Sequence, residues 1–315
     1  MLRCKEKLCV AAKFGLVFLM HATKSTKPEW VFLNDRFIHA DEATISPFDR
    51  GYLFAHAAYE VTAVYNGQLI DFDGHLARLE RTLEGIQLPN PMNKERWLNL
   101  HAEILRQNEI TEGLIYLQVS GGDYGFRDFA GPETLEPTVF MFAVSKPLIS
   151  DMAQHGIAAI TLPDTRWARR DLKTTQLLSQ ALAYRSAQSQ RAFTAIMHED
   201  GMVTEAASAN VWIVNKHGHL QTRQLSHAIL PGITRASAFD LIAKQGVEIE
   251  EVGFSLKELK SAQEVFTTSA GALIAPVTRI DDDAIADAKP GPVTRQVQRL
   301  YYTKMGVDLD EIDWL

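Results

Sequence analysis

The chain has 315 residues, 46% of them hydrophobic and 23% charged, with a net charge of −7. This balance is typical of a globular protein with room for about two domains, and it excludes global disorder, collagen and coiled coil. The acidic charge provides no electrostatic footprint for nucleic acid or an anionic membrane, so neither partner is expected and a small-molecule partner is favoured.

Residues 1–27 are predicted to be a disordered extension. Basic residues precede a short apolar run from Phe14 to Met20, but this run is too short to span a bilayer and no signal-cleavage site follows it. The only cysteines, Cys4 and Cys9, lie in this segment. We therefore expect no disulfide or thiolate-bound zinc in the rest of the chain, and a cytoplasmic location is favoured.

Residues 28–147 predict a smaller domain of hairpins and helices. The sequence Asn66-Gly67 is a favoured hairpin turn, and leucines at spacings of three and four predict two helices that cover one face of a sheet. A glycine-rich loop over 121–132 is of the length that often carries function. The expected strands are 30–33, 36–39, 59–65, 68–72, 113–120 and 138–144, and the expected helices are 75–86 and 94–108.

Residues 148–315 predict a larger domain in which strands and helices are again interleaved. Because hairpins are frequent, the expected class is α+β (mixed α/β) rather than a doubly wound parallel sheet. The helix over 174–190 is expected to have Leu177, Leu178, Ala181 and Leu182 on one apolar face. The expected strands are 156–162, 194–198, 218–222, 264–268 and 275–280, with 202–214 as two short strands or one bulged strand, and the other expected helices are 235–245 and 292–304.

Several common enzyme motifs are absent from the sequence. It contains no phosphate loop, no Gly-x-Gly-x-x-Gly fingerprint, no nucleophile elbow and no His-Glu-x-x-His helix. His217 and His219 form the closest histidine pair, but no carboxylate or thiolate lies at ligand spacing. They therefore predict an exposed turn, and no metal site is expected.

The most informative segment is residues 166–176, which read RWARRDLKTTQ. Lys173 is expected directly before a helix and close to three arginines. The positive end of a helix dipole and nearby positive charges both favour a free, nucleophilic amine. A solvated basic turn is the alternative, because charge clusters usually face water.

Further segments offer groups that suit a phosphorylated, cationic ring. Glu205 is followed by small residues and an apolar strand, where a carboxylate can hold a buried ring nitrogen. Residues 230–235 (LPGITR) lead into a helix and offer backbone N–H groups and a hydroxyl to a phosphate. Residues 267–271 (TTSAG) form a second cup with similar donors, and Arg78 carries a compensating charge.

Together these segments closely resemble the fold-type IV pyridoxal-phosphate enzymes, above all the D-amino-acid (D-alanine) aminotransferases. The resemblance covers about residues 30–305. It implies a two-domain D-amino-acid aminotransferase-like fold with the cofactor between the domains, in a homodimer whose active site lies at the subunit interface. The matching segments are DRGYLF (49–54), YEV (59–61), HLARL (75–79), RW (166–167), DLK (171–173), TE (204–205), Ser208 with Asn210, and GITR (232–235).

The resemblance also implies roles for single residues. Lys173 is expected to form the internal aldimine with pyridoxal phosphate and to move the proton between substrate Cα and cofactor C4′. Glu205 is expected to pair with the pyridine nitrogen and keep it protonated. Tyr59 is expected to bind the substrate, and Arg127 to take the α-carboxylate of a substrate in the neighbouring subunit. The other expected cofactor contacts are Arg78, Leu230, Ile233, Thr234 and Ser269.

The chain departs from the family pattern near the expected substrate site. Residues 55–57 (AHA) stand where Gly-Asp-Gly is common, residues 120–122 (SGG) replace Thr-Arg-Gly, and Phe129 replaces a frequent histidine. These changes leave open whether Arg127 alone holds the carboxylate. Ala270 replaces a threonine of the second phosphate cup, so that a phosphate hydrogen bond of a type that contributes ~1.5–3 kcal/mol is either lost or supplied by Ser269 or Thr268.

The sequence therefore predicts an aminotransferase that converts D-alanine and 2-oxoglutarate to pyruvate and D-glutamate, or that exchanges other D-amino acids. The alternatives on the same fold are a branched-chain L-amino-acid aminotransferase, an (R)-amine transaminase and aminodeoxychorismate lyase, and Arg127 favours the first interpretation. A non-enzymatic pyridoxal-phosphate carrier is an alternative from another class. The presence of both Lys173 and Glu205 argues against such a carrier.

Overall fold

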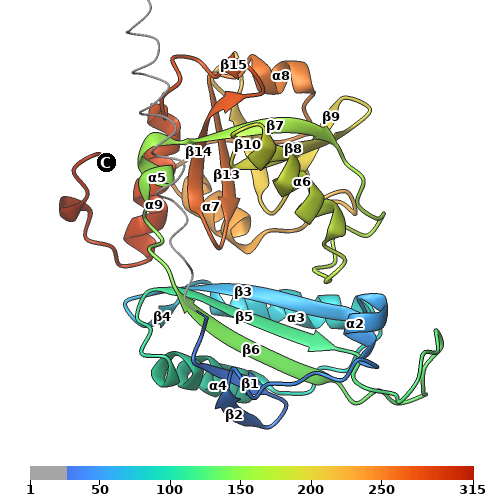
Figure 1. Cartoon of the computed structure of the whole chain (residues 1–315). Coiled ribbons are helices and arrows are strands. Elements are labelled where there is room, and N and C mark those ends of the chain that lie inside the picture. The colour runs from blue at the N-terminus through green and yellow to red at the C-terminus, as the bar shows by residue number, and fades with distance from the viewer. Residues whose placement is uncertain (1–26) are drawn as a thin grey trace, which may run out of the picture.

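The structure is a computed structural model that describes residues 27–315. Almost all of the predicted N-terminal extension thus lies outside the described residues. Two β-sheets organise the rest, one built from residues 30–145 and one from residues 157–284, and each occupies its own half of the molecule (Figure 1). Helices and antiparallel hairpins alternate along the chain, which confirms the mixed α+β class.

The first sheet has the strand order β2-β1-β6-β5-β3-β4, and all of its neighbouring strands are antiparallel. Both predicted hairpins of this sheet are confirmed. Asn34 and Asn66-Gly67 adopt positive φ angles at their turns, which favoured hairpin turns require. The strands are β1 (Trp30–Leu33), β2 (Arg36–His39), β3 (Ala57–Tyr65), β4 (Gln68–Leu69), β5 (Gly113–Ser120) and β6 (Thr138–Ser145).

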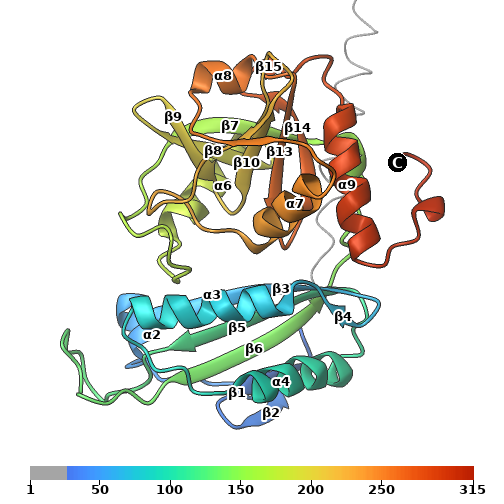
Figure 2. The same cartoon turned by 180° about the vertical axis from the view of Figure 1, so that it is seen from behind.

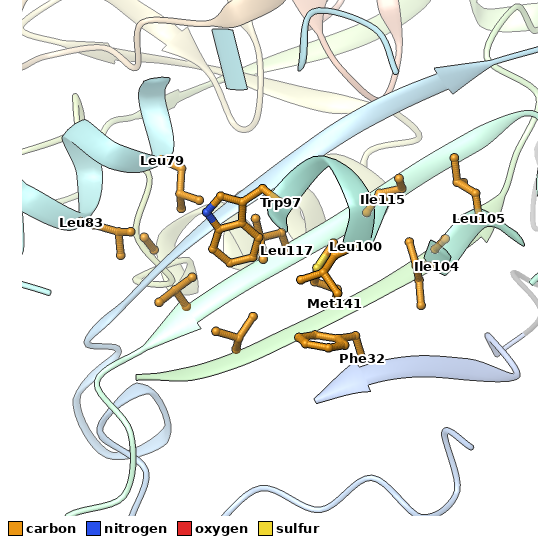
Figure 3. Packing of buried hydrophobic residues seen from close by; sticks show 14 of the residues in the cluster. Phe32, Leu79, Leu83, Trp97, Leu100, Ile104, Leu105, Ile115, Leu117 and Met141 are labelled. Atoms are coloured by element: carbon orange, nitrogen blue, oxygen red, sulfur yellow. The ribbon is translucent and has the colours of Figure 1, made fainter. Parts of the chain in front are cut away.

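Two helices, α3 (Phe72–Gly85) and α4 (Lys94–Gln107), cover one face of this sheet (Figure 2). Leu79 and Leu83 of α3 and Trp97 of α4 are buried against the strands, as Figure 3 shows. The leucine spacing places these side chains in one stripe, so the predicted packing is confirmed. The opposite face of the sheet, which carries Tyr59, remains available to the second half of the chain.

The second sheet has the order β12-β11-β10-β13-β14-β7-β8-β9, with β15 paired to β14. The chain passes from the first sheet to the second once, between Ser145 and Ile157. The strands are β7 (Ile157–Pro163), β8 (Thr194–Glu199), β9 (Met202–Ala206), β10 (Asn210–Val214), β11 (Leu220–Thr222), β12 (Ile249–Glu251), β13 (Glu264–Ser269), β14 (Leu273–Ile280) and β15 (Asp283–Ala284). The other helices are α2 (Arg50–Phe54), α5 (Asp151–His155), α6 (Leu178–Ser189), α7 (Ile233–Ala243), α8 (Leu256–Lys260), α9 (Pro292–Lys304) and a 3₁₀ turn, η1 (Leu309–Glu311).

Helix α6 differs from its prediction in both its start and its buried face. It begins at Leu178, four residues later than expected. Leu178 and Leu182 of the predicted apolar face are 72% and 54% exposed, whereas Ala183 and Ala187 are buried against β8. The small alanines let the helix approach the strand closely and leave its leucines outside.

None of the helices described over residues 27–315 combines the length and the apolar character needed to cross a membrane.

Candidate active site

A cavity of about 310 Å³ is lined by residues from both halves of the chain. The structure brings most of the predicted site together around this space. The predicted residues that line it are Tyr59, Arg78, Lys173, Glu205, Leu230, Ile233, Thr234 and Ser269. Arg127 does not line it and is described below.

Lys173 is held in the cavity wall by contacts with the first half of the chain. Its carbonyl accepts a hydrogen bond from the Tyr59 N–H at 3.0 Å, and its own N–H donates to Thr82 Oγ1 at 3.3 Å. The Lys173 Nζ atom lies 4.1 Å from the centre of the Tyr59 ring. The expectation that Lys173 directly precedes a helix is wrong, because α6 begins at Leu178.

The arginines near Lys173 are paired with carboxylates. Arg166 binds both Asp164 and Glu205, the Asp164 contact being 2.7 Å. Arg170 and Arg169 also form ion pairs, with Glu199 and Asp171 respectively. Their positive charge is thereby offset by neighbouring carboxylates.

Glu205 lies on β9 with 3% of its surface exposed. Its carboxylate accepts hydrogen bonds from the Leu230 N–H at 3.1 Å and from Asn210 Nδ2 at 2.9 Å, and it also pairs with Arg166. Burial raises the pKa of the Glu205 carboxyl, and the Arg166 guanidinium and the Leu230 N–H act against that rise. A buried acid of this kind, with like charge from Asp164 nearby, suits a further cationic partner such as a protonated ring nitrogen.

Helix α7 offers an anion site at its N-terminus. Its N-cap is Gly232, no side chain caps it, and its first turn contains no acidic residue. The N–H groups of Ile233 and Thr234, which line the cavity, are therefore suited to a phosphate. A Cβ at position 232 would lie 2.0 Å from Asn210 Oδ1, so the close approach to Asn210 requires glycine here.

Arg78 joins this anion site to the first sheet through a buried ion pair that we did not predict. Its guanidinium donates two hydrogen bonds of 2.7 Å to Glu60 and one of 3.1 Å to the Pro231 carbonyl. His75 Nδ1 donates to the same carboxylate at 2.8 Å. Although burial acts to raise it, the Arg78 and His75 partners hold the pKa of Glu60 well below its usual range.

Glu60 could have been found from the sequence. It alternates with Tyr59 and Val61 in a strand, so period-two geometry places it on the other face, toward the helix that carries Arg78. Both Glu60 and His75 lie within segments that match the family, but neither was predicted to have a role.

Ser269 ends β13 and begins a tight turn on the other side of the cavity. Its hydroxyl accepts a hydrogen bond from the Ala272 N–H at 3.2 Å. Lys146, which we did not predict as a site residue, also lines the cavity, and its Nζ donates to the Gly271 carbonyl at 2.5 Å.

Arg127 lies away from this cavity, on the loop over 121–132. Its guanidinium stacks over the rings of Phe54 and Phe129, 5.3 and 4.6 Å from their centres. That Arg127 binds the substrate carboxylate in the active site of a neighbouring subunit stays a prediction.

The loop that carries Arg127 is fixed by Arg50. The Arg50 guanidinium donates to the carbonyls of Asp128 and Phe129 at 2.7 and 2.9 Å. Its Nε donates to His56 Nδ1 at 3.2 Å, and His56 Nε2 in turn donates to the Ile86 carbonyl at 2.8 Å. His56 is one of the departures from the family pattern, and this chain of hydrogen bonds gives it a structural role.

Within the described part of the chain, no cluster of three or more His, Cys, Asp or Glu is placed to hold a metal ion. His219 instead pairs with Glu250 at 2.6 Å on the surface.

Comparison with known proteins identifies relatives over nearly the whole chain. The family model for class IV amino-transferases matches residues 57–280. A D-alanine aminotransferase from Listeria innocua is 35% identical over 286 residues, which cover 90% of this chain and 99% of the relative. One from Staphylococcus haemolyticus is 37% identical over 269 residues, covering 85% of this chain and 95% of the relative.

Solved structures show the same fold. The branched-chain amino acid aminotransferase of Escherichia coli superposes with a TM-score of 0.82 at 22% identity, covering 91% of this chain and 98% of that one. A second branched-chain enzyme, from Thermobaculum terrenum in its PLP-bound holo form, gives a TM-score of 0.76 at 23% identity over 91% and 97% of the two chains.

Proposed function

The chain belongs to the class IV aminotransferases, and on that premise we propose that it is a pyridoxal-phosphate-dependent D-amino-acid transaminase. Its substrates are an amino acid and a 2-oxo acid, with D-alanine and 2-oxoglutarate giving pyruvate and D-glutamate. The observation that carries the proposal is the meeting of Lys173, Glu205 and the uncapped N-terminus of α7 around one cavity. The D-alanine aminotransferases at 35–37% identity support the choice of D-amino acids.

The cavity residues fit pyridoxal phosphate. When bound, this cofactor supplies an aldehyde that condenses with amines and a protonated ring that accepts the electron pair released at the substrate Cα. The Ile233 and Thr234 N–H groups and Arg78 are suited to its phosphate, and Glu205 to its ring nitrogen. Ser269, in the turn over 267–271, is suited to the other side of the phosphate, and Leu230 lines the cavity beside the expected position of the ring.

Attachment of the cofactor, proton transfer and orientation of Glu205 are carried out by side chains and backbone groups of this chain. Lys173 Nζ provides the amine that attaches the cofactor, and it carries the proton to and from the substrate Cα. Arg166, Asn210 and the Leu230 N–H orient Glu205. Tyr59, whose ring faces Lys173 Nζ at 4.1 Å, forms the wall next to which the substrate binds.

A branched-chain L-amino-acid aminotransferase is the second candidate. It is favoured by the solved structures of that name, but identities of 22–24% show the fold alone. Arg127 favours the D-amino-acid candidate, because it resembles the loop arginine that in the D-amino-acid enzymes takes the substrate α-carboxylate, a group that a guanidinium binds through two parallel hydrogen bonds.

We also propose a homodimer, located in the cytoplasm. Large apolar side chains are exposed on the single chain, among them Tyr52 at 76%, Phe129 at 73% and Leu178 at 72%. Exposed apolar groups of this size favour an interaction surface. A second copy that covers Phe129 would also contact Arg127, whose guanidinium stacks over that ring.

The activity is tested by mixing the cofactor-loaded protein with D-alanine and 2-oxoglutarate and measuring the pyruvate formed. Lys173→Ala is expected to lower the rate by at least about 10²-fold, since it removes both the attachment amine and the proton carrier. Lys289→Ala changes an exposed lysine and is the matched control. Normal turnover by Lys173→Ala would remove Lys173 from the catalytic role, and absence of pyruvate with the unaltered protein would exclude the proposed reaction.

A further inference from the structure

The candidate phosphate site is divided between the two halves of the chain. Arg78 comes from α3 of the first half, whereas Ile233 and Thr234 begin α7 of the second half. A binding group is effective only when the structure around it holds it in place before the ligand arrives. The contacts that fix α3 relative to α7 therefore determine how well these groups fit a phosphate.

Two contacts join the helices close to the site. Arg78 donates to the Pro231 carbonyl at 3.1 Å, just before α7 begins. A Cβ at Gly74 would lie 3.0 Å from Ile233 Cγ2, so the first turns of α3 and α7 pack closely together. This packing limits how near the helices can approach, but it provides no directional attraction that holds them there.

Asp71, the residue directly before α3, supplies that attraction. Its carboxylate accepts hydrogen bonds from the Tyr301 hydroxyl at 2.8 Å and from the Ser237 hydroxyl at 3.3 Å, and it forms an ion pair with Lys304. Ser237 lies on α7, and Tyr301 and Lys304 lie on α9. Lys304 Nζ also donates to the Ser237 hydroxyl, so three donors of the second half converge on one carboxylate of the first.

These contacts are sheltered from water. The Asp71 side chain is 10% exposed, and Tyr301 is 1% exposed. Burial, together with the negative charge of Asp71, raises the pKa of the Tyr301 phenol well above its usual range, so the phenol remains a hydrogen-bond donor. Hydrogen bonds to a charged group are the stronger ones, and a low local dielectric strengthens them further.

Asp71 has the residue type and the position of a helix N-cap, but it does not act as one. An aspartate at this position usually accepts a hydrogen bond from an N–H group of its own helix. The Asp71 side chain makes no such bond, and its backbone is left-handed, with φ 56° and ψ 28°. A residue other than glycine keeps this conformation where surrounding contacts enforce it. The donors on α7 and α9 are such contacts.

We propose that Asp71 is a positioning residue for the phosphate site, because it holds the N-terminus of α7 at the separation from Arg78 that a phosphate requires. The proposal rests on the proposed function for the assignment of pyridoxal phosphate to this cavity. Asp71 is not among the residues that line the cavity, so it acts through the groups that do. Its negative charge alone would disfavour a nearby phosphate, so charge and positioning predict opposite effects of its removal.

The test compares the affinity of the cofactor-free protein for pyridoxal phosphate with its affinity for pyridoxal, which lacks the phosphate. Asp71→Asn removes the charge without changing the size of the side chain. We expect the affinity for pyridoxal phosphate to fall about 10-fold or more, as when contacts that orient a binding group are removed, and the affinity for pyridoxal to stay unchanged. Asp73→Asn is the matched control, because it removes the same charge from the first turn of α3, where Asp73 pairs with Lys94 on the surface.

Lys304→Met tests the same contacts from the second half. Lys304 is 38% exposed, so this variant is expected to fold, and it should also weaken the binding of pyridoxal phosphate selectively. Equal losses for both ligands in Asp71→Asn and Lys304→Met would indicate a general loss of structure and would overturn the proposal. Unchanged or stronger binding of pyridoxal phosphate, or an equal effect of Asp73→Asn, would also overturn it.

If the unaltered protein binds pyridoxal phosphate no better than pyridoxal, the phosphate site is wrongly assigned and the role of Asp71 is refuted with it. A failure of the proposed substrates is detected separately. It appears as the absence of pyruvate from D-alanine in an unaltered protein that still binds the cofactor, and the two affinities do not depend on it.

Discussion

Lys173 and Glu205 are separated by 32 positions in the sequence, and both were predicted because their segments, taken together with others, resemble one enzyme family. The residue types indicate their chemistry: Lys173 is an amine among charged side chains, and Glu205 is an acid followed by small residues. Glu60 and Lys146 were not identified as site residues. Glu60 pairs with Arg78 because of the strand face on which it lies, and Lys146 lies in the cavity wall because the second half of the chain places Gly271 beside it.

His101 shows how burial at one residue links stability to pH. It lies on α4 with 2% exposure, and its Nδ1–H donates to the Trp97 carbonyl at 2.7 Å. Burial lowers the pKa of His101 to about 4 from an ordinary value near 6.5. Between these values the unfolded chain binds more protons than the folded chain, so the free energy of unfolding falls as the pH falls.

We expect this residue to remove about 3 kcal/mol of stability between pH 6.5 and pH 4. Urea unfolding at a series of pH values in this range measures the slope. His101→Leu should flatten it, whereas His217→Gln, at an exposed histidine, should leave it unchanged. Equal slopes in His101→Leu and the unaltered protein would show that other groups cause the pH dependence.

At the scale of elements, most strands and helices of the first sheet could be predicted, because hairpin turns and leucine spacing are local signals. The start of α6 could not be predicted from such signals. Thr174 forms a β-bridge with Ala58, and the Thr175 N–H donates to the Ala57 carbonyl at 3.1 Å. These contacts with β3 hold the segment in extended form, so tertiary structure overrides the local helical pattern.

The loop over 121–132 was predicted as a functional loop, but the residue that holds it was not. Arg50 is 78 positions from its acceptor on Asp128, and a side chain to backbone contact over that distance leaves no local pattern. Arg50→Ala removes the two hydrogen bonds that fix the backbone of the two residues directly after Arg127. We expect the KM for D-alanine to rise about 10-fold or more, with faster proteolytic cleavage of the loop.

Arg36→Ala, at an exposed arginine on β2, is the control for this change. A raised cleavage rate with an unaltered KM would mean that the loop, and with it Arg127, does not contribute to substrate binding.

At the scale of the whole molecule, two features remain predictions. One is the division into domains at residues 28–147 and 148–315, which agrees with the single passage of the chain between the sheets. The other is the dimer. Leu178 and Leu182 on α6 favour a dimer most clearly. They are exposed on the single chain, although the sequence predicts that they share an apolar face of the helix.

Leu178→Glu tests the dimer by placing a charge on this stripe. We expect the variant to shift toward monomer in sedimentation equilibrium, since burying an unpaired charge at an interface is unfavourable. Val247→Glu changes a residue that is 47% exposed between α7 and β12, and is the matched control. If the unaltered protein is monomeric, or if both variants dimerise equally, the surface around Leu178 is not the interface.

The preference for a D-amino acid over an L-amino acid or an amine can be tested by one absorbance measurement. The cofactor-loaded protein is mixed separately with D-alanine, L-leucine and (R)-1-phenylethylamine, without any 2-oxo acid, and its absorbance is recorded before and after. We expect D-alanine alone to convert the cofactor from its pyridoxal form to its pyridoxamine form. Conversion by L-leucine or by the amine, with none by D-alanine, would contradict it and would assign this fold and site to a different substrate.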